Sequence, residues 1–270
     1  MKLFLILMLA CAAIAEDDLP PALVELFNKA VEAQKAGRLD TAEKAFLEVL
    51  SQGGRKAFVH NNLGIIYQQR GDHERAVAQF REAVRLDANY APPRVLMGTS
   101  LLALGRTREA TAALERAIKI APREPAARLE LARAYERSAN FMGAVEQFRE
   151  LRALAPRDPE YAYQLGRAYM RLSASCLEQL TQAAPGSARV NQAIAENLMT
   201  QGRTEEAVRA YHRVAESVPD MPEIHLALAQ VYIQQGKAEQ ARLEIDRELA
   251  IVPDSAAALE LKRRLETGRP

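Results

Sequence analysis

Small, apolar and turn-forming residues recur along the chain with a period of 34 positions, in two groups. The positions that mark the period hold Gly37, Gly71, Gly105, Ala139, Gly202 and Gly236. Seven residues before each marker the side chain is small: Ala30, Gly64, Gly98, Ala132, Ala195 and Ala229. Five residues after each marker lies an alanine, and nine after it a large apolar residue: Phe46, Phe80, Leu114, Phe148, Tyr211 and Ile245. Because apolar residues recur at helical spacing on both sides of each marker, the pattern predicts two helices per period, joined by a turn.

Each part of this pattern has a physical cause. Glycine ends a helix in the left-handed conformation, which costs other residues about 1 kcal/mol or more. Thr107 and Thr204, two residues after their glycines, are predicted to cap the second helix through their hydroxyl groups. The small residues let the two helices approach closely. Each pair has an apolar face that it cannot bury alone, so the sequence predicts an all-α fold, an α-α superhelical solenoid of stacked helix pairs.

One unit is shorter than the others. Pro156 and Pro185 are 29 residues apart, five fewer than the period, and the loss falls between Met170 and Ala184. Ser175-Cys176-Leu177-Glu178 has the form of a capping box, which predicts a short second helix beginning near Ser175. The alternative is a single helix that continues through Leu172. In either case we expect the solenoid to change curvature here, because the helix pair is truncated.

Prolines close the units and fix their predicted boundaries; they are Pro122, Pro156, Pro219 and Pro253. The expected organisation is a signal peptide (1–15), a linker (16–22), seven repeats (23–56, 57–90, 91–124, 125–158, 159–187, 188–221 and 222–255) and a C-terminal capping helix (256–270). We number these repeats 1 to 7. In the capping helix, Ala258, Leu261 and Leu265 form one apolar stripe, which a solenoid needs to seal its last apolar face.

The first 15 residues have the features of a signal peptide. Lys2 precedes an apolar run that is too short to span a bilayer, and Ala13-Ile14-Ala15 has the small side chains that signal peptidase requires. We therefore expect an exported protein, periplasmic or secreted, with no transmembrane span after cleavage. The alternative is a lipoprotein signal, in which Cys11 carries a lipid anchor that holds the protein at a membrane.

Composition and charge narrow the class of protein. The chain of 270 residues has 36 Lys and Arg against 35 Asp and Glu, and cleavage would remove Lys2 and leave equal numbers. This balance argues against nucleic acid as a partner. Cleavage would also leave Cys176 as the only cysteine, so no intramolecular disulfide could form, and Cys176 is predicted to be a small buried apolar residue. Five of the eight tyrosines fall at packing positions of the repeats: Tyr67, Tyr135, Tyr169, Tyr211 and Tyr232.

The second repeat carries a family resemblance. Asn62-Leu63-Gly64, followed by Tyr67, Ala76, Phe80 and Ala83, resembles the tetratricopeptide repeat. The resemblance extends over residues 23–255, although the third repeat has leucines at aromatic positions and the chain contains no Trp. It implies helix pairs whose first helices line a concave groove.

Motifs for catalysis, cofactors or metals do not emerge from the sequence. No two of the histidines, His60, His73, His212 and His225, are close enough in sequence to suggest a metal site. The phosphate-binding GxxxxGK[ST] motif and the hydrolase motifs GxSxG and HExxH do not occur. We therefore expect neither an enzyme nor a cofactor-binding protein.

Helical spacing also picks out residues on the inner face of the first helices. The candidate partner-binding groove consists of Asn61, Gln68, Arg133, Arg137, Tyr163, Arg167 and Arg171. Asparagine and glutamine can bond a peptide backbone, and arginine can bind carboxylates through two hydrogen bonds, which suggests an acidic or C-terminal partner segment. The alternative is a solvated helix face on which Glu130 and Glu136 neutralise Arg133.

The sequence thus favours an exported, non-enzymatic scaffold that binds a segment of another protein in the groove of a solenoid. Its alternatives are a self-associating structural component of the cell envelope and a lipid-anchored envelope assembly factor.

Overall fold

The computed structural model describes residues 19–267, in which every regular element is an α-helix. The predictions for the signal peptide, Lys2 and Cys11 lie outside the described residues. The chain divides into two compact parts between Leu172 and Ser173. We call residues 19–172 the N-terminal part and residues 173–267 the C-terminal part.

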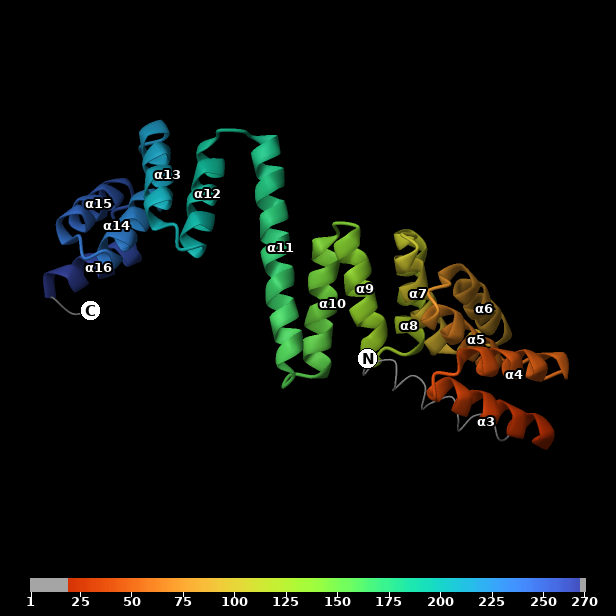
Figure 1. Ribbon diagram of the computed structural model, residues 1–270. Helices are drawn as coiled ribbons and strands as arrows, with labels where there is room; N and C mark the ends of the chain where they lie inside the picture. The colour runs from red at the N-terminus through yellow and green to blue at the C-terminus, as the bar shows by residue number, and fades with distance from the viewer. Residues whose placement is uncertain (1–18, 268–270) are drawn as a thin grey trace. The chain divides into compact units, whose positions relative to one another are not determined.

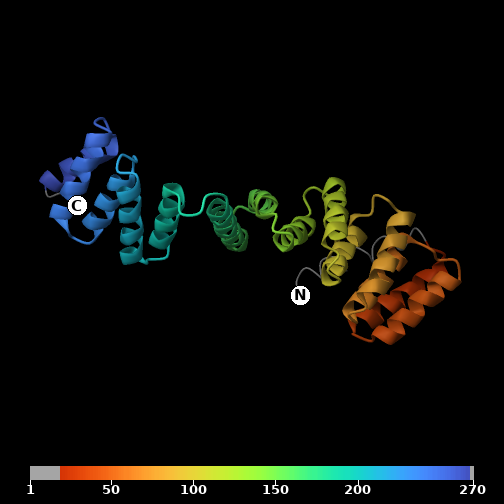
Figure 2. The same ribbon diagram turned by 90° about the horizontal axis from the view of Figure 1, so that it is seen from above.

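The N-terminal part contains four complete helix pairs (Figure 1). Its helices are α3 (Pro21–Lys35), α4 (Leu39–Ser51), α5 (Ala57–Gln69), α6 (His73–Leu86), α7 (Ala91–Ala103), α8 (Thr107–Ile120), α9 (Pro125–Arg137) and α10 (Phe141–Leu154), followed by the first residues of α11 (Pro159–Ala183). The helices of each pair lie side by side, and each pair packs on the next, as the two views together show (Figure 2).

The turns follow the prediction closely. All five marker glycines have positive φ, between 71° and 78°. Ala139 adopts the same conformation with φ 56°, although its side chain disfavours it. The turn is therefore imposed by the packing of the two helices, and glycine is the residue that meets this demand with least strain.

The small residues also lie where the period predicts. Gly64 is covered by the ring of Phe80, so closely that a Cβ on Gly64 would lie 2.5 Å from a ring carbon. A Cβ on Gly98 would lie 2.6 Å from the Leu114 side chain. Each first helix thus receives a large side chain from its second helix in the space that a small residue leaves open.

The predicted threonine caps are wrong. Thr107 and Thr204 are the first residues of α8 and α13 (Thr204–Ser217), and neither helix has a side-chain cap. The capping position lies one residue earlier, directly after the marker. Asp72 and Asn140 occupy it in repeats 2 and 4, and their side-chain oxygens accept from the backbone N–H three residues later.

The second helix predicted for repeat 5 does not form. The structure has the alternative, one continuous helix α11 of 25 residues. No glycine or proline lies between Leu172 and Ala183, so nothing in this stretch ends the helix. Cys176, predicted to be buried, is exposed on α11, and Tyr169 is 48% exposed although its equivalent Tyr67 is buried.

The C-terminal part holds the last two repeats and the capping helix. Besides α13 it contains α12 (Ala188–Thr200), α14 (Ile224–Gln234), α15 (Ala238–Ile251) and α16 (Ala256–Thr267). Ala258 of α16 is fully buried against Ala229 and Ile245, and Leu261 and Leu265 pack on the same cluster. The capping helix therefore covers the apolar face of repeat 7, as its stripe predicted.

Candidate functional site

Two of the predicted groove residues are engaged inside the N-terminal part. Asn61 is only 1% exposed. The Gln68 amide nitrogen donates to the Leu96 carbonyl oxygen at 3.2 Å and to the hydroxyl oxygens of Thr99 and Ser100 at 2.7 and 2.9 Å. The Gln68 amide joins α5 to the next first helix, α7, because the first helices of these neighbouring repeats lie against each other. The structure thus places Asn61 and Gln68 in packing contacts rather than on an open groove.

The predicted arginines lie on the first helices of repeats 4 and 5. Arg133 and Arg137 are on α9, and Arg167 and Arg171 are on α11. We call these four residues the arginine cluster. Arg133 is largely exposed and pairs with Glu130 at 2.5 Å. Arg171 reaches from α11 to Glu136 on α9 at 3.1 Å. The predicted neutralisation of Arg133 by Glu130 is therefore present, and a second ion pair joins the two helices.

The other two arginines have no carboxylate partner in the ion pairs of residues 19–267. A guanidinium nitrogen of Arg137 donates to the backbone carbonyl of Leu102 on α7. Arg167 donates to the Gln164 side chain at 3.2 Å and lies 5.9 Å from the centre of the Tyr163 ring. The cluster thus holds four guanidinium groups against two carboxylates, which leaves a local excess of positive charge.

One of the two carboxylates is buried. Glu130 is 5% exposed, and this burial raises the pKa of its carboxyl group, while Arg133 and Arg137 oppose the rise. Burial thus disfavours the ionised form of the Glu130 carboxyl group, whereas the ion pair with Arg133 favours it.

Large apolar side chains lie exposed beside the cluster. On α11, Tyr163 is 62% exposed and Met170 is 66% exposed. Exposed side chains of this size, close to guanidinium groups without a carboxylate partner, are typical of surfaces that bind another protein. Periodicity alone placed Tyr163 on the first helix of repeat 5 but gave no measure of its exposure.

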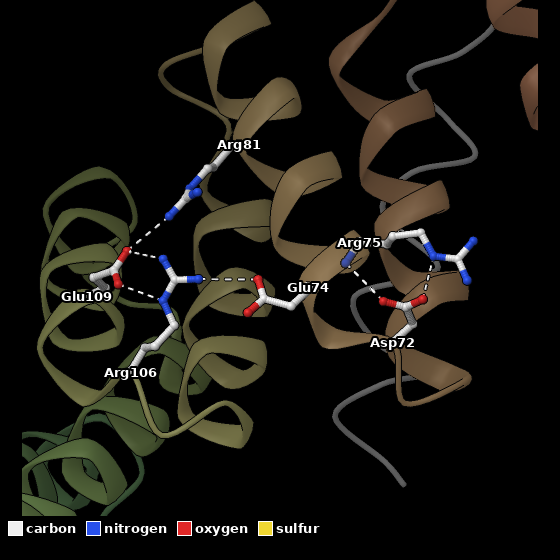
Figure 3. A network of polar contacts seen from close by, with 6 residues as sticks. All are labelled: Asp72, Glu74, Arg75, Arg81, Arg106 and Glu109. Carbon is white, nitrogen blue, oxygen red and sulfur yellow. Dashed lines mark hydrogen bonds and ion pairs between the residues drawn. The ribbon is translucent and has the colours of Figure 1, made fainter.

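A network of ion pairs that the sequence did not reveal joins α6 to α8 (Figure 3). Arg106 binds both carboxylate oxygens of Glu109, at 2.7 and 2.8 Å, and reaches Glu74 at 3.3 Å. Arg81 also contacts Glu109 at 3.0 Å. The hydrogen bonds from Arg106 lower the pKa of Glu109. The charged groups of this network pair with one another, so we interpret it as a contact that stabilises the packing of repeat 2 on repeat 3 and not as a ligand site.

Two histidines at equivalent places make equivalent contacts. His60 Nδ1 lies 2.8 Å from Gln79 Oε1 in repeat 2, and His225 Nδ1 lies 2.6 Å from Glu244 Oε2 in repeat 7. Each bond joins the first helix of a repeat to its second helix. Among residues 19–267, no three His, Cys, Asp or Glu side chains gather closely enough to hold a metal ion. The described helices also include none that is long and apolar enough to cross a membrane.

The fold and the site together define the class of protein: an array of helix-pair repeats with a charged surface on its first helices. Tetratricopeptide repeat family models match residues 57–90, 101–168, 160–220 and 198–265. The chain belongs to the tetratricopeptide repeat family.

Solved structures agree with this assignment. A tetratricopeptide repeat protein from Parabacteroides merdae is 15% identical with a TM-score of 0.51, over 92% of this chain and all of that one. The C-terminal part of a TPR repeat-containing protein from Cytophaga hutchinsonii is 16% identical with a TM-score of 0.51, over 87% of this chain and 98% of the other. At such identities the likeness shows the shared fold alone. A comparison with curated protein sequences finds no match.

Proposed function

We propose that this chain is a non-enzymatic scaffold that binds an acidic segment of another protein at the arginine cluster. The tetratricopeptide fold suggests a role in protein–protein interaction. The observation that carries the finer proposal is the excess of guanidinium groups: Arg137 and Arg167 have no carboxylate partner in the described ion pairs.

Binding at the cluster would need little rearrangement. Arg133 and Arg171 lie on two regular helices, so their backbone positions exist before a partner arrives. A partner carboxylate would take up charge-assisted hydrogen bonds from guanidinium groups that are still partly exposed to water. Such binding weakens with salt, because screening reduces attraction between exposed charges.

A peptide titration tests this proposal. Two fluorescent 12-residue peptides are needed, identical except that one carries four glutamates where the other carries four lysines. The double variant Arg137→Gln with Arg167→Gln is expected to bind the acidic peptide about tenfold more weakly than the unmodified chain, a loss of about 1.4 kcal/mol. Arg149→Gln on α10, which removes an exposed i,i+3 ion pair with Glu146, is the matched control. Equal binding of both peptides, or an unaffected double variant, would contradict the proposal.

We further propose that the protein acts after export, in the periplasm or outside the cell. The sequence of residues 1–15 supports this proposal. Mass spectrometry of the mature protein tests it: a free N-terminal Glu16 is the expected product, whereas a diacylated Cys11 would instead mean a membrane anchor. An intact Met1 in the purified protein would overturn both.

A further inference from the structure

Repeat 5 lacks a helix that every other repeat provides. In four of the six complete repeats, the small residue of the first helix and the large residue of the second lie in one buried cluster, and in the other two Phe80 and Leu114 lie directly against Gly64 and Gly98. The pair Gly64 and Phe80 shows how tight the contact is, because a Cβ on Gly64 would lie 2.5 Å from the ring. The equivalent residue in repeat 5 is Gly166. It is exposed, and a Cβ on it would have no neighbouring atom within 4 Å.

Exposed residues surround Gly166 on one face of α11. They lie three and four positions to either side of it, which is the spacing of neighbours on a helix surface. We call the five residues the α11 strip: Ala162, Tyr163, Gly166, Tyr169 and Met170. The other face of α11 is held in the core of the N-terminal part, where Leu165 and Ala168 pack with Phe148 and Leu151 of α10.

The shape of the strip favours a helix as its occupant. A small residue flanked by large ones forms the hollow into which helix side chains pack at interaxial distances of about 8–10 Å. The chain itself uses this arrangement at Gly64 and Gly98, where the second helix supplies Phe80 and Leu114.

The charge beside the strip favours an acidic occupant. Arg167 and Arg171 are four positions apart, so they lie on the same edge of α11. Arg167 is within cation–π distance of the Tyr163 ring and donates a hydrogen bond to the side chain of Gln164, which is neutral. A helix lying over Gly166 would carry one of its polar edges past both guanidinium groups.

We infer that the α11 strip binds an amphipathic helix of a partner protein, with a large apolar side chain over Gly166 and carboxylates beside Arg167 and Arg171. The partner helix takes the position that the second helix holds in the complete repeats. This inference rests on the proposed function and deepens it, since it names the form of the acidic segment.

Three synthetic peptides separate the helical form from charge alone. The first is an 18-residue peptide stapled into a helix, with a central Phe on its apolar face and glutamates along one edge. The second replaces these glutamates with lysines. The third has the same number of glutamates and one Phe in a Gly/Ser-rich sequence that stays unfolded. Fluorescence anisotropy with the full mature chain is expected to give a Kd at least tenfold lower for the acidic helix than for either other peptide.

Two variants of α11 test the geometry. In Gly166→Leu the new side chain occupies the hollow and meets no neighbouring atoms of the chain, so we expect the variant to fold, which circular dichroism verifies. We expect it to bind the acidic helix at least tenfold more weakly. The same variant is expected to leave the weaker binding of the unfolded acidic peptide unchanged. Arg167→Glu is expected to reverse the preference between the acidic and basic helices. Arg149→Glu on α10 is the matched charge reversal away from the strip and is expected to change neither.

The outcomes distinguish this inference from the proposed function. If neither acidic peptide binds, both are overturned. If both acidic peptides bind equally and Gly166→Leu has no effect, the proposed function stands and the helix inference is overturned. Light scattering on the peptide-free chain tests the alternative that a second copy of the chain occupies the α11 strip. A concentration-dependent dimer that Gly166→Leu abolishes would show this and would overturn the inference.

Discussion

The strain at individual turn positions is uneven along the chain. Five turns satisfy the left-handed conformation with glycine, whereas the turn between α9 and α10 uses Ala139 at φ 56°. The Cβ of alanine makes this conformation unfavourable by roughly 1–2 kcal/mol. The fold carries this cost because the helices on both sides of the turn are already fixed by packing.

Exchanging the two residue types at equivalent turns should therefore move stability in opposite directions. Ala139→Gly is expected to raise the free energy of unfolding by about 1 kcal/mol, and Gly71→Ala to lower it by a similar amount. Urea titrations followed by circular dichroism measure both. A loss of stability in Ala139→Gly would mean that the freedom of glycine in the unfolded chain outweighs the relief of strain.

The buried carboxylate of Glu130 predicts a pH dependence. Because burial raises its pKa in the fold, the folded chain holds this proton more tightly than the unfolded chain does. Stability attributable to Glu130 is therefore highest at low pH and falls as pH rises from the ordinary glutamate pKa to the raised value. Glu130→Gln is expected to raise Tm relative to the unmodified chain at pH 7.

The same comparison at pH 4 provides the control. There both side chains are neutral, so the difference in Tm between Glu130→Gln and the unmodified chain is expected to disappear. A difference that stays constant from pH 4 to pH 7 would show that Arg133 and Arg137 compensate for the burial, and the linkage would then be absent.

At the scale of the element, the helices differ in how their first turns are satisfied. Asp72 caps α6, with φ −84° and ψ 73°. Lys237 stands at the same place before α15 with nearly the same backbone, φ −89° and ψ 67°, but its side chain offers no acceptor. A lysine at this end also faces the positive end of the helix dipole.

Supplying the missing acceptor is expected to stabilise α15. Lys237→Asp should raise the free energy of unfolding of the C-terminal part by about 0.5–1 kcal/mol, whereas Asp72→Ala should lower that of the N-terminal part by about 1 kcal/mol. Thermal melts of the two variants measure both changes. No gain in Lys237→Asp would indicate that the Lys237 contact with the Tyr232 ring is worth as much as the cap.

What the sequence predicted at this scale, and what it did not, has a physical explanation. The markers and the small residues were predicted because both depend on contacts within one helix pair, which the period records. The packing roles of Asn61 and Gln68 were not predicted, because the period places a residue on a helix face but does not indicate how deeply the next repeat buries it. The arginines were placed on the correct helices, but their partners Glu136 and Leu102 come from other repeats. The helix α11 continues past Leu172 because no glycine or proline ends it there. The capping box near Ser175 predicted a new helix, but it does not interrupt a helix that nothing else ends.

At the scale of the whole molecule, stability is expected to vary along the chain. In α5, ten of 13 residues are buried, whereas α11 has only two buried residues, Leu165 and Ala168. From Tyr169 to Arg189 no residue is buried. Since a helix in a protein depends on its packed face more than on its own propensity, this segment is expected to open locally more often than its neighbours.

Hydrogen exchange measured by mass spectrometry tests this expectation. Peptides from residues 173–189 should exchange at least tenfold faster than peptides from α5, because local opening costs less where few side chains are buried. Addition of the stapled acidic helix should slow exchange in α11 near Gly166 and leave α5 unchanged. Uniform protection along the chain would contradict the prediction.

The short repeat also has a meaning for how such proteins change. An array of helix pairs is tolerant of alteration because each pair contacts mainly its neighbours. The five positions that repeat 5 lacks include the marker, at which the other repeats form the turn between their two helices. Without this turn, repeat 5 forms one continuous helix in place of a helix pair. One short in-frame deletion is thus enough to leave a vacant helix position on an otherwise intact array. In a lineage of such arrays, a new binding surface can arise by losing sequence rather than by adding it.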